Sequence, residues 1–154
     1  MKRGIANGAR ALLLLSLGLA SGIAVSAADA MQSEVRVELL DPSAGIGITT
    51  MAIDAHPATI HSGKITFNVI NRSRTLTHEL VLVRVDHTDH QLPYDRTADE
   101  VNEGAVTRIG EVPDLPPGGH GSLTVTVPPG PYMLICNQPG HYSAGMHALL
   151  TVRP

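Results

Sequence analysis

The sequence has a single cysteine, no tryptophan and few other aromatic residues among its 154 positions. A lone cysteine cannot form a disulfide within the chain, so Cys136 is a buried inert thiol, a link to a second molecule or a metal ligand. The aromatic residues that are present are Phe67, Tyr94, Tyr132 and Tyr142. So few rings, in a chain without a basic surplus, argue against a nucleic-acid-binding protein.

Long hydrophobic runs are scarce as well, and the one near the N-terminus, residues 11–25, is too short to span a bilayer comfortably. Basic residues precede this run, and small residues follow it, with cleavage expected after Ala27 or Ala30. This order predicts a cleaved secretory signal peptide over residues 1–30 and a periplasmic location. An uncleaved membrane anchor is the alternative, and the serines and glycines within the run count against it. No cysteine lies near the cut, so a lipid anchor is not expected.

Removal of the signal peptide leaves residues 31–154, which is enough for one domain with its own core. Eight basic and thirteen acidic residues lie in this part, which gives it a formal net charge of −5. It contains no internal repeat, no low-complexity tract and no long run of like charge. We therefore expect one mildly acidic domain that does not bind nucleic acid.

Helical periodicity is almost absent from this domain, whereas alternation of apolar and polar residues is common. Val35, Val37 and Leu39, for example, alternate with charged residues. The run at 78–85 is apolar at nearly every position, which predicts a more deeply buried strand. Strands are predicted at residues 35–39, 48–55, 65–69, 78–85, 122–127, 132–136 and 148–152. Short strands separated by glycine and proline predict an all-β fold, a Greek-key β-sandwich of about seven or eight strands.

The segment from residue 86 to residue 115 does not fit this pattern. It is polar, contains Pro93 and Pro113, and has no clean periodicity. We interpret it as a long excursion from the sandwich, with a helical turn near residues 97–103. Loops of this length are usually either functional or poorly ordered.

Three residues whose side chains bind metals recur at equal intervals near the C-terminus: Cys136, His141 and Met146. Cys136 ends a predicted strand, and glycines in the two short loops after it allow the backbone to bend tightly beside a metal. A trigonal site of one thiolate and two imidazoles, with a weak axial thioether, is tolerated by both Cu(I) and Cu(II). The spacing therefore predicts three ligands of a mononuclear copper site.

The second imidazole must come from elsewhere in the chain, and His78 is the best candidate. It opens the buried strand at 78–85, and a Greek key can bring that strand end beside the end of the cysteine strand. The other histidines lie in or beside polar turns, except His147, whose side chain should point away from that of Met146. We expect all of them to be solvated surface residues: His56, His61, His87, His90, His120 and His147.

Zinc, or no metal at all, is the alternative for the main site. Zinc binds cysteine and histidine readily but makes little use of methionine, so Met146 favours copper. A dinuclear copper site would need a second cysteine, which the chain lacks. A separate, weak surface metal site could be formed by Asp86, His87, Asp89 and His90.

Six residues separate Asn71 from His78, and the segments PGPYMLIC, PGH and GM follow near the C-terminus. This pattern resembles the cupredoxins, or type 1 blue copper proteins, and the ligand spacing is similar to that of the rusticyanin and sulfocyanin type. The C-terminal segment is more similar still to small bacterial cupredoxin-like proteins of unsettled role. The resemblance covers essentially all of residues 31–154. It implies a Greek-key sandwich that binds one copper ion through four ligands, namely His78, Cys136, His141 and Met146.

One position departs from the pattern of the plastocyanin- and azurin-like members. The residue after the first histidine is Glu79, where those proteins typically have an asparagine that helps to tie the two ligand loops together. Because hydrogen bonds around the cysteine sulfur tune the potential of the metal, the resemblance gives no reduction potential for this chain. We expect the backbone N–H of Glu79 to donate to the sulfur of Cys136.

Two tyrosines near the expected site have different expected roles. Tyr132 follows a Pro-Gly-Pro turn, and its hydroxyl is expected to bond back to the chain at a corner of the sandwich, a structural role rather than that of an electron relay. Tyr142 lies beside His141 on a loop with small apolar residues. This loop is either a docking patch for a partner or an ordinary polar loop.

A site with four protein ligands has no open position for a substrate, so we expect an electron carrier and not an enzyme. Redox partner proteins such as cytochromes or copper oxidases would supply and accept the electrons, and no stable membrane span is expected after signal removal. The alternative is a periplasmic protein for copper buffering, delivery or resistance. Delivery would be better served by exposed, mobile ligands than by a closed site.

Overall fold

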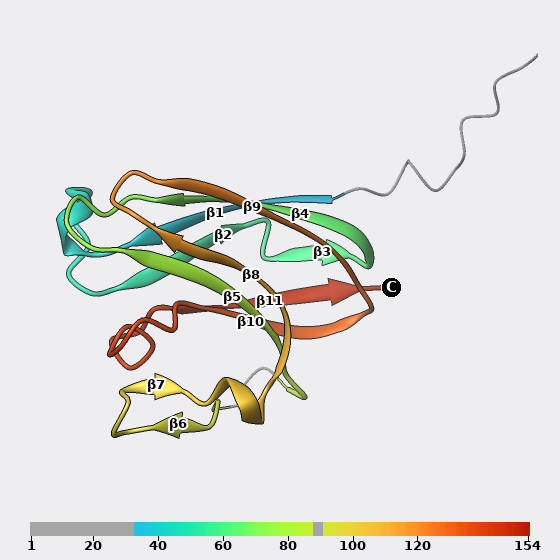
Figure 1. Cartoon of the computed structure of the whole chain (residues 1–154). Helices are drawn as coiled ribbons and strands as arrows, with labels where there is room; N and C mark the ends of the chain where they lie inside the picture. The colour runs from blue at the N-terminus through green and yellow to red at the C-terminus, as the bar shows by residue number, and fades with distance from the viewer. Residues whose placement is uncertain (1–32, 88–90) are drawn as a thin grey trace, which may run out of the picture.

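The computed structural model describes residues 33–87 and 91–154, which form two β-sheets packed face to face and a small separate hairpin (Figure 1). The predicted signal peptide, residues 1–30, and the positions of Asp89 and His90 lie outside the described residues. Among the residues that are described, no helix is both long and apolar enough to cross a membrane.

The first sheet has four strands in the order β2-β1-β4-β9. These strands are β1 (Ser33–Leu40), β2 (Ala52–His56), β4 (Gly63–Asn71) and β9 (His120–Val127). Strand β1 is parallel to β4 and antiparallel to β2, whereas β4 and β9 are antiparallel. A short 3-10 helix, η2 (Pro42–Ala44), follows β1.

The second sheet has five strands in the order β3-β11-β10-β5-β8. These strands are β3 (Thr59–His61), β5 (His78–Arg84), β8 (Thr107–Leu115), β10 (Gly130–Ile135) and β11 (His147–Arg153). The central strand β10 is antiparallel to both β5 and β11. The end of β10 therefore lies between the start of β5 and the start of β11.

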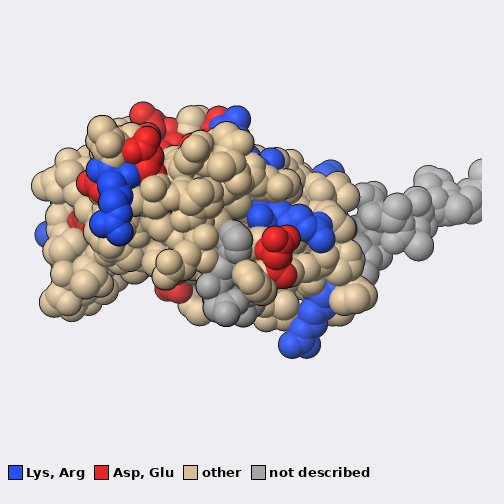
Figure 2. All heavy atoms as spheres, turned by 90° about the horizontal axis from the view of Figure 1, so that it is seen from below, with Lys and Arg blue, Asp and Glu red and all other residues tan. Residues whose placement is uncertain are grey.

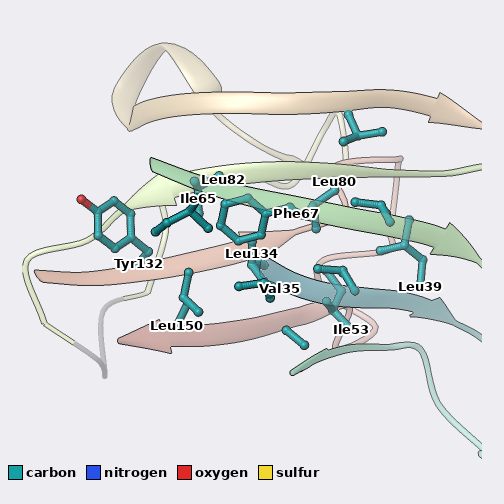
Figure 3. Packing of buried hydrophobic residues seen from close by; sticks show 14 of the residues in the cluster. Val35, Leu39, Ile53, Ile65, Phe67, Leu80, Leu82, Tyr132, Leu134 and Leu150 are labelled. Carbon is teal, nitrogen blue, oxygen red and sulfur yellow. The ribbon is translucent and has the colours of Figure 1, made fainter. Parts of the chain in front are cut away.

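The main core fills the space between the two sheets. Val35 and Phe67 face inward from the first sheet, and Leu80, Leu134 and Leu150 face inward from the second, all of them buried (Figure 3). Burial of each such side chain contributes about 1.5–3 kcal/mol to stability. The period of two in the sequence is thus the alternation between this core and the outer faces.

A second apolar cluster covers the outer face of the second sheet. Residues of β5 that alternate with those of the main core, such as Val81 and Val83, pack here with Ile135 of β10. Leu92 and Val101, from the segment after β5, close the cluster from outside. Strand β5 is therefore buried on both faces, which explains why its sequence is apolar at nearly every position.

The predicted β-sandwich is confirmed, and strands are present at or near all seven predicted positions. The sequence pattern does not predict β3 or β8. Strand β3 is only three residues long, and β8 lies at the edge of its sheet with most of its residues exposed. Irregularities in the pairing of β5 with β8 also break the alternation on which the prediction depended.

The part of the chain that leaves the two sheets is shorter than the predicted excursion, because β8 begins at Thr107. The excursion contains the hairpin of β6 (Tyr94–Asp95) and β7 (Glu100–Val101), followed by a 3-10 helix, η3 (Glu103–Ala105). The helical turn expected near 97–103 corresponds to the tight turn of this hairpin, residues 96–99, with η3 just beyond it. Figure 1 shows the hairpin lying against the second sheet.

Candidate metal centre

The four predicted ligands are brought to one end of the second sheet. His78 is the first residue of β5, Cys136 directly follows β10, and Met146 directly precedes β11. Because β10 pairs with both of these strands, with Ile135 opposite Val81 and His147, three strand ends meet at this point. His141 arrives on the loop between β10 and β11.

The loop from residue 136 to residue 146 is closed by its own backbone hydrogen bonds. The N–H of Cys136 donates to the carbonyl of Met146 over 3.1 Å, and the N–H of Met146 donates to the carbonyl of His141 over 3.0 Å. Gly140 and Gly145 have φ angles of 80° and 97°, a region that disfavours side chains. Glycine at these two positions therefore allows the chain to return the histidine and the methionine to the cysteine.

The thiol and the two imidazoles converge with their potential ligand atoms within 4.8 Å of one another. The Sγ of Cys136 lies 3.4 Å from the Nδ1 of His141 and 3.8 Å from the Nδ1 of His78. The two Nδ1 atoms are 3.1 Å apart. A metal ion in the plane of the three donors would have bonds of about 2.0 Å to nitrogen and about 2.3 Å to sulfur. These bonds would set the sulfur–nitrogen spacing at about 3.7 Å and the nitrogen–nitrogen spacing at about 3.5 Å, so the donors fit one small cation.

Met146 is fully buried and belongs to the same apolar cluster as Cys136. Its backbone is hydrogen-bonded to the backbones of Cys136 and His141, so the side chain of Met146 begins close to the thiol and the two imidazoles. A thioether is a soft, weak ligand that suits Cu(I) and is of little use to zinc. The donor set of one thiol, two imidazoles and a neighbouring thioether therefore fits copper.

Burial controls the charge state of the donors. It raises the pKa of the Cys136 thiol to about 11, against hydrogen bonds from the backbone at Glu79 and Gln138 that lower it. It lowers the pKa of both imidazoles, so His78 and His141 are neutral near pH 7 and available as ligands. A thiolate in this position is stable only beside a cation.

The N–H of Glu79 donates to the sulfur of Cys136 over 3.5 Å, which confirms the expected backbone contact between the two ligand-bearing strands. The carboxyl of Glu79 is half-buried. Burial, aided by the negative charges of Asp114 and Glu103, raises its pKa to about 7. Glu79 thus replaces the asparagine typical of plastocyanin-like members. Its side chain has different chemistry, but its backbone N–H still contacts the sulfur of Cys136.

The excursion supports the ligand loop, a role that its sequence does not reveal. The side chain of Asn137, next to Cys136, accepts the N–H of Val101 over 2.7 Å and donates to the carbonyl of Val101 over 3.1 Å. The N–H of Gly140 donates to the carbonyl of Asp99 over 2.8 Å. These bonds fasten the loop that carries His141 to the hairpin of β6 and β7.

A second buried amide organises the loops on the other side of the site. The Asn71 side chain donates to the carbonyls of Leu76 and Leu115, each over 2.9 Å, and accepts the N–H of Ser73. It thereby fixes the turn that leads into His78. In the sequence Asn71 is visible only as one end of a spacing pattern, because its partners lie in the turn before β5 and at the end of β8, which is far away in the chain.

Sequence reasoning missed Asp41, which is almost fully buried beside His78. Its Oδ2 lies 3.1 Å from the Nε2 of His78, and its Oδ1 accepts the N–H of Ser43 over 2.7 Å. Burial alone would raise the pKa of Asp41, but hydrogen bonds from Ser43, Ser73 and His78 outweigh it and lower the pKa to about 2. In the sequence, the Asp-Pro pair at 41–42 indicates only the end of a strand.

The other described histidines do not join the site. All are exposed: His56, His61, His87, His120 and His147. His56 lies 2.8 Å from Asp54, and the ring of His147 contacts that of Tyr142. Within the described ranges, His78, Cys136 and His141 form the only group of three or more histidine, cysteine or acidic side chains close enough to hold a metal ion. The weak surface site stays a prediction, because two of its four residues lie outside those ranges.

The two tyrosines near the site have different contacts. The Tyr132 hydroxyl donates to the carbonyl of Pro128 over 2.8 Å, which confirms the corner bond predicted from the sequence. Tyr142 packs against the outer cluster, and its hydroxyl accepts the N–H of Leu92. It therefore helps to attach the excursion, and it is not simply a free side chain on a polar loop.

Known structures share this fold. Dithionite-reduced auracyanin from Roseiflexus castenholzii is 24% identical, with a TM-score of 0.55, over 80% of this chain and 98% of that one. Auracyanin A, a blue copper protein from Chloroflexus aurantiacus, is 21% identical (TM-score 0.55; 79% and 99% covered). Rusticyanin from Thiobacillus ferrooxidans is 17% identical (TM-score 0.57; 80% and 78% covered). At these identities the likeness establishes the fold alone.

Sequence comparison gives the family directly. No curated protein sequence matches the chain significantly. The profile of the copper-binding proteins of the plastocyanin/azurin family, however, matches residues 41–153, a span that is well over half of the chain and includes the positions of all four predicted ligands. With the sandwich fold and the converging thiol and imidazoles, this match places the chain in the plastocyanin/azurin family of copper-binding proteins.

Proposed function

We propose that the protein is a mononuclear type 1 copper protein that carries single electrons between redox partners. The proposed ligands are His78, Cys136, His141 and Met146. The observation that carries the proposal is the convergence of one thiol and two imidazole nitrogens within 4.8 Å at one end of the sandwich. Membership of a copper-binding family supports copper over zinc as the ion.

The fold supplies what electron transfer requires of a protein. Copper, when bound, supplies the Cu(I)/Cu(II) couple. His78 begins β5, which is buried on both faces, and Cys136 directly follows the neighbouring strand β10, so both ligands are held by inner strands of the second sheet. Rigid ligands need little rearrangement when an electron arrives, and the N–H of Glu79 stabilises negative charge on the sulfur.

His141 is the natural point of electron exit and entry. Of the three convergent donors it alone is only partly buried, and Pro139 and Ala144 on the same loop are exposed. A partner such as a cytochrome or a copper oxidase would dock there, with the imidazole as a short path to the metal. On the face seen in Figure 2, from the side of the β6–β7 hairpin, charged side chains form small separate groups with uncharged surface between them.

The closed site argues against an enzyme. His78, Cys136 and Met146 are each 0% exposed, and four protein ligands leave no position for a substrate. The predicted signal peptide at residues 1–30 supports a periplasmic location for this electron carrier.

The test is the visible spectrum of the purified protein after addition of Cu(II). We expect intense blue absorption from thiolate-to-copper charge transfer, and its loss in Cys136→Ser. A colourless wild-type complex would contradict a type 1 site, and tight zinc binding in its place would favour the zinc alternative.

A second measurement separates electron transfer from copper handling. Voltammetry of the copper-loaded protein should give reversible one-electron cycles with no loss of metal. Transfer of Cu(I) to a chelator or to a copper-free partner during cycling would favour buffering or delivery instead.

A further inference from the structure

The strongest observation beyond the ligand set is the pairing of two buried polar side chains across the sandwich. Asp41 follows β1 of the first sheet, whereas His78 begins β5 of the second. Asp41 is 1% exposed and His78 is 0% exposed. The carboxylate Oδ2 lies 3.1 Å from the Nε2 of His78, on the opposite side of the ring from Cys136.

This contact determines which nitrogen of His78 carries the proton. A carboxylate only accepts hydrogen bonds, so the Nε2 of a neutral His78 must carry hydrogen and donate to Asp41. The Nδ1 is then left with a free lone pair, directed toward the Sγ of Cys136 and the Nδ1 of His141. Asp41 thus presets both the tautomer and the orientation that a metal ligand requires.

The loop around Asp41 holds the carboxylate in place. Its Oδ1 caps the 3-10 helix η2 by accepting the N–H of Ser43, and the hydroxyl of Ser43 in turn lies 3.0 Å from that of Ser73. Ser73 belongs to the turn that leads into His78. The carboxylate and the imidazole are therefore positioned by the same pair of loops.

The charge of Asp41 has no cationic side chain to balance it. Among the described residues no lysine or arginine forms an ion pair with Asp41, so hydrogen bonds from neutral groups such as the N–H of Ser43 and the ring of His78 are what stabilise its buried charge. On the proposed function, a copper ion lies one imidazole ring away. The carboxylate and the Cys136 thiolate together neutralise Cu(II), whereas with Cu(I) they leave one negative charge in excess.

We propose that Asp41 is a positioning residue of the copper centre, which fixes His78 with its Nδ1 toward the metal and stabilises the oxidised over the reduced ion. This inference rests on the proposed function for its redox part only. Its orienting part concerns the protein before metal is bound.

The redox part is tested with Asp41→Asn, which keeps an oxygen acceptor but removes the charge. We expect the blue site to persist, and the ratio of Cu(II) affinity to Cu(I) affinity to fall at least tenfold, equivalent to a rise of about 59 mV in reduction potential. The matched control is Asp54→Asn, which removes the same charge from an exposed position on β2. The control should change the ratio less than twofold. An equal ratio in wild type and Asp41→Asn would overturn the redox part.

The orienting part is tested in the metal-free protein by nitrogen-detected NMR of the histidine rings. We expect His78 in the wild type to be the Nε2–H tautomer, and in Asp41→Ala to show a substantial Nδ1–H population. Unchanged tautomers would overturn the orienting role. Should Asp41→Ala fail to fold, Asp41→Leu gives the same readout, because its side chain fills a similar volume and also offers no acceptor to the Nε2 of His78. If the wild type binds no copper, the proposed function fails, while the tautomer measurement still decides the orienting role.

Discussion

At the scale of single residues, the Tyr132 hydroxyl shows how a polar group in the core keeps its hydrogen bonds. The ring is 0% exposed within the main core, and the hydroxyl donates to the carbonyl of Pro128 at the turn before β10. The guanidinium of Arg84 donates to the hydroxyl oxygen of Tyr132 over 3.4 Å. These contacts give Tyr132 a structural role at a corner of the sandwich.

We expect Tyr132→Phe to lower the free energy of unfolding by about 1 kcal/mol, because the part-buried hydrogen bond from the hydroxyl to the carbonyl of Pro128 is lost. Urea denaturation measures this loss. The copper spectrum and the electron self-exchange rate should stay unchanged. Slower electron exchange at unaltered stability would instead indicate that the tyrosine is a relay, and Tyr94→Phe, which removes a more exposed hydroxyl, is the control.

The residues that sequence reasoning found and those it missed differ in how local their signal is. Cys136, His141 and Met146 are visible because one loop carries all three at equal spacing. Asp41 and Asn137 act through partners tens of residues away, on other strands and on the excursion. No spacing rule connects such pairs, so the groups that orient the site became visible only with the topology.

At the scale of elements, the excursion between β5 and β8 has the clearest structural role. It covers the outer faces of β5 and β10 and holds the ligand loop through Asn137 and Gly140. Its polar sequence does not predict this, because a few scattered residues, namely Leu92, Tyr94, Val101 and Val106, suffice to close a cluster whose other members lie mostly on the sheet. The buried strand at 78–85 was predictable, but the cause of its second buried face was not.

We expect Asn137→Ala to lower the free energy of unfolding by about 2–3 kcal/mol, since the N–H and carbonyl of Val101 lose their buried partners. Loosening of the loop should also accelerate loss of copper to a chelator. Thermal denaturation and the rate of bleaching of the blue band measure the two effects.

The control for this prediction is the neighbouring Gln138→Ala. Its side chain donates to Asp114 in an exposed hydrogen bond, so the loss should be below about 1 kcal/mol. Equal losses in the two variants would show that the excursion does not clamp the loop through Asn137.

At the scale of the whole molecule, the metal centre depends on both sheets. The proposed ligands come from the second sheet, and Asp41 comes from the end of β1 in the first. His78 and Cys136 are 58 positions apart in the chain. The β-sandwich class followed from strand periodicity alone, whereas the parallel pairing of β1 with β4 has no local sequence signal.

Because only the folded state presents the complete donor set, copper should stabilise the whole domain. At a free copper concentration one hundred times the dissociation constant, the gain is about 2.7 kcal/mol. Calorimetry should show a higher Tm for the copper-loaded protein, a return to the metal-free Tm after chelation, and no comparable shift in Cys136→Ser. A copper-independent Tm in the wild type would contradict a site built from the folded state.

The long sequence separation of His78 from the other three proposed ligands bears on when the proposed blue colour would appear during folding. In an unfolded chain, Cys136, His141 and Met146 are close together in sequence, but His78 lies 58 positions before Cys136. During refolding from urea in the presence of copper, the appearance of blue absorption would therefore report the pairing of β5 with β10 in the second sheet, and not the first encounter of the ion with the sulfur.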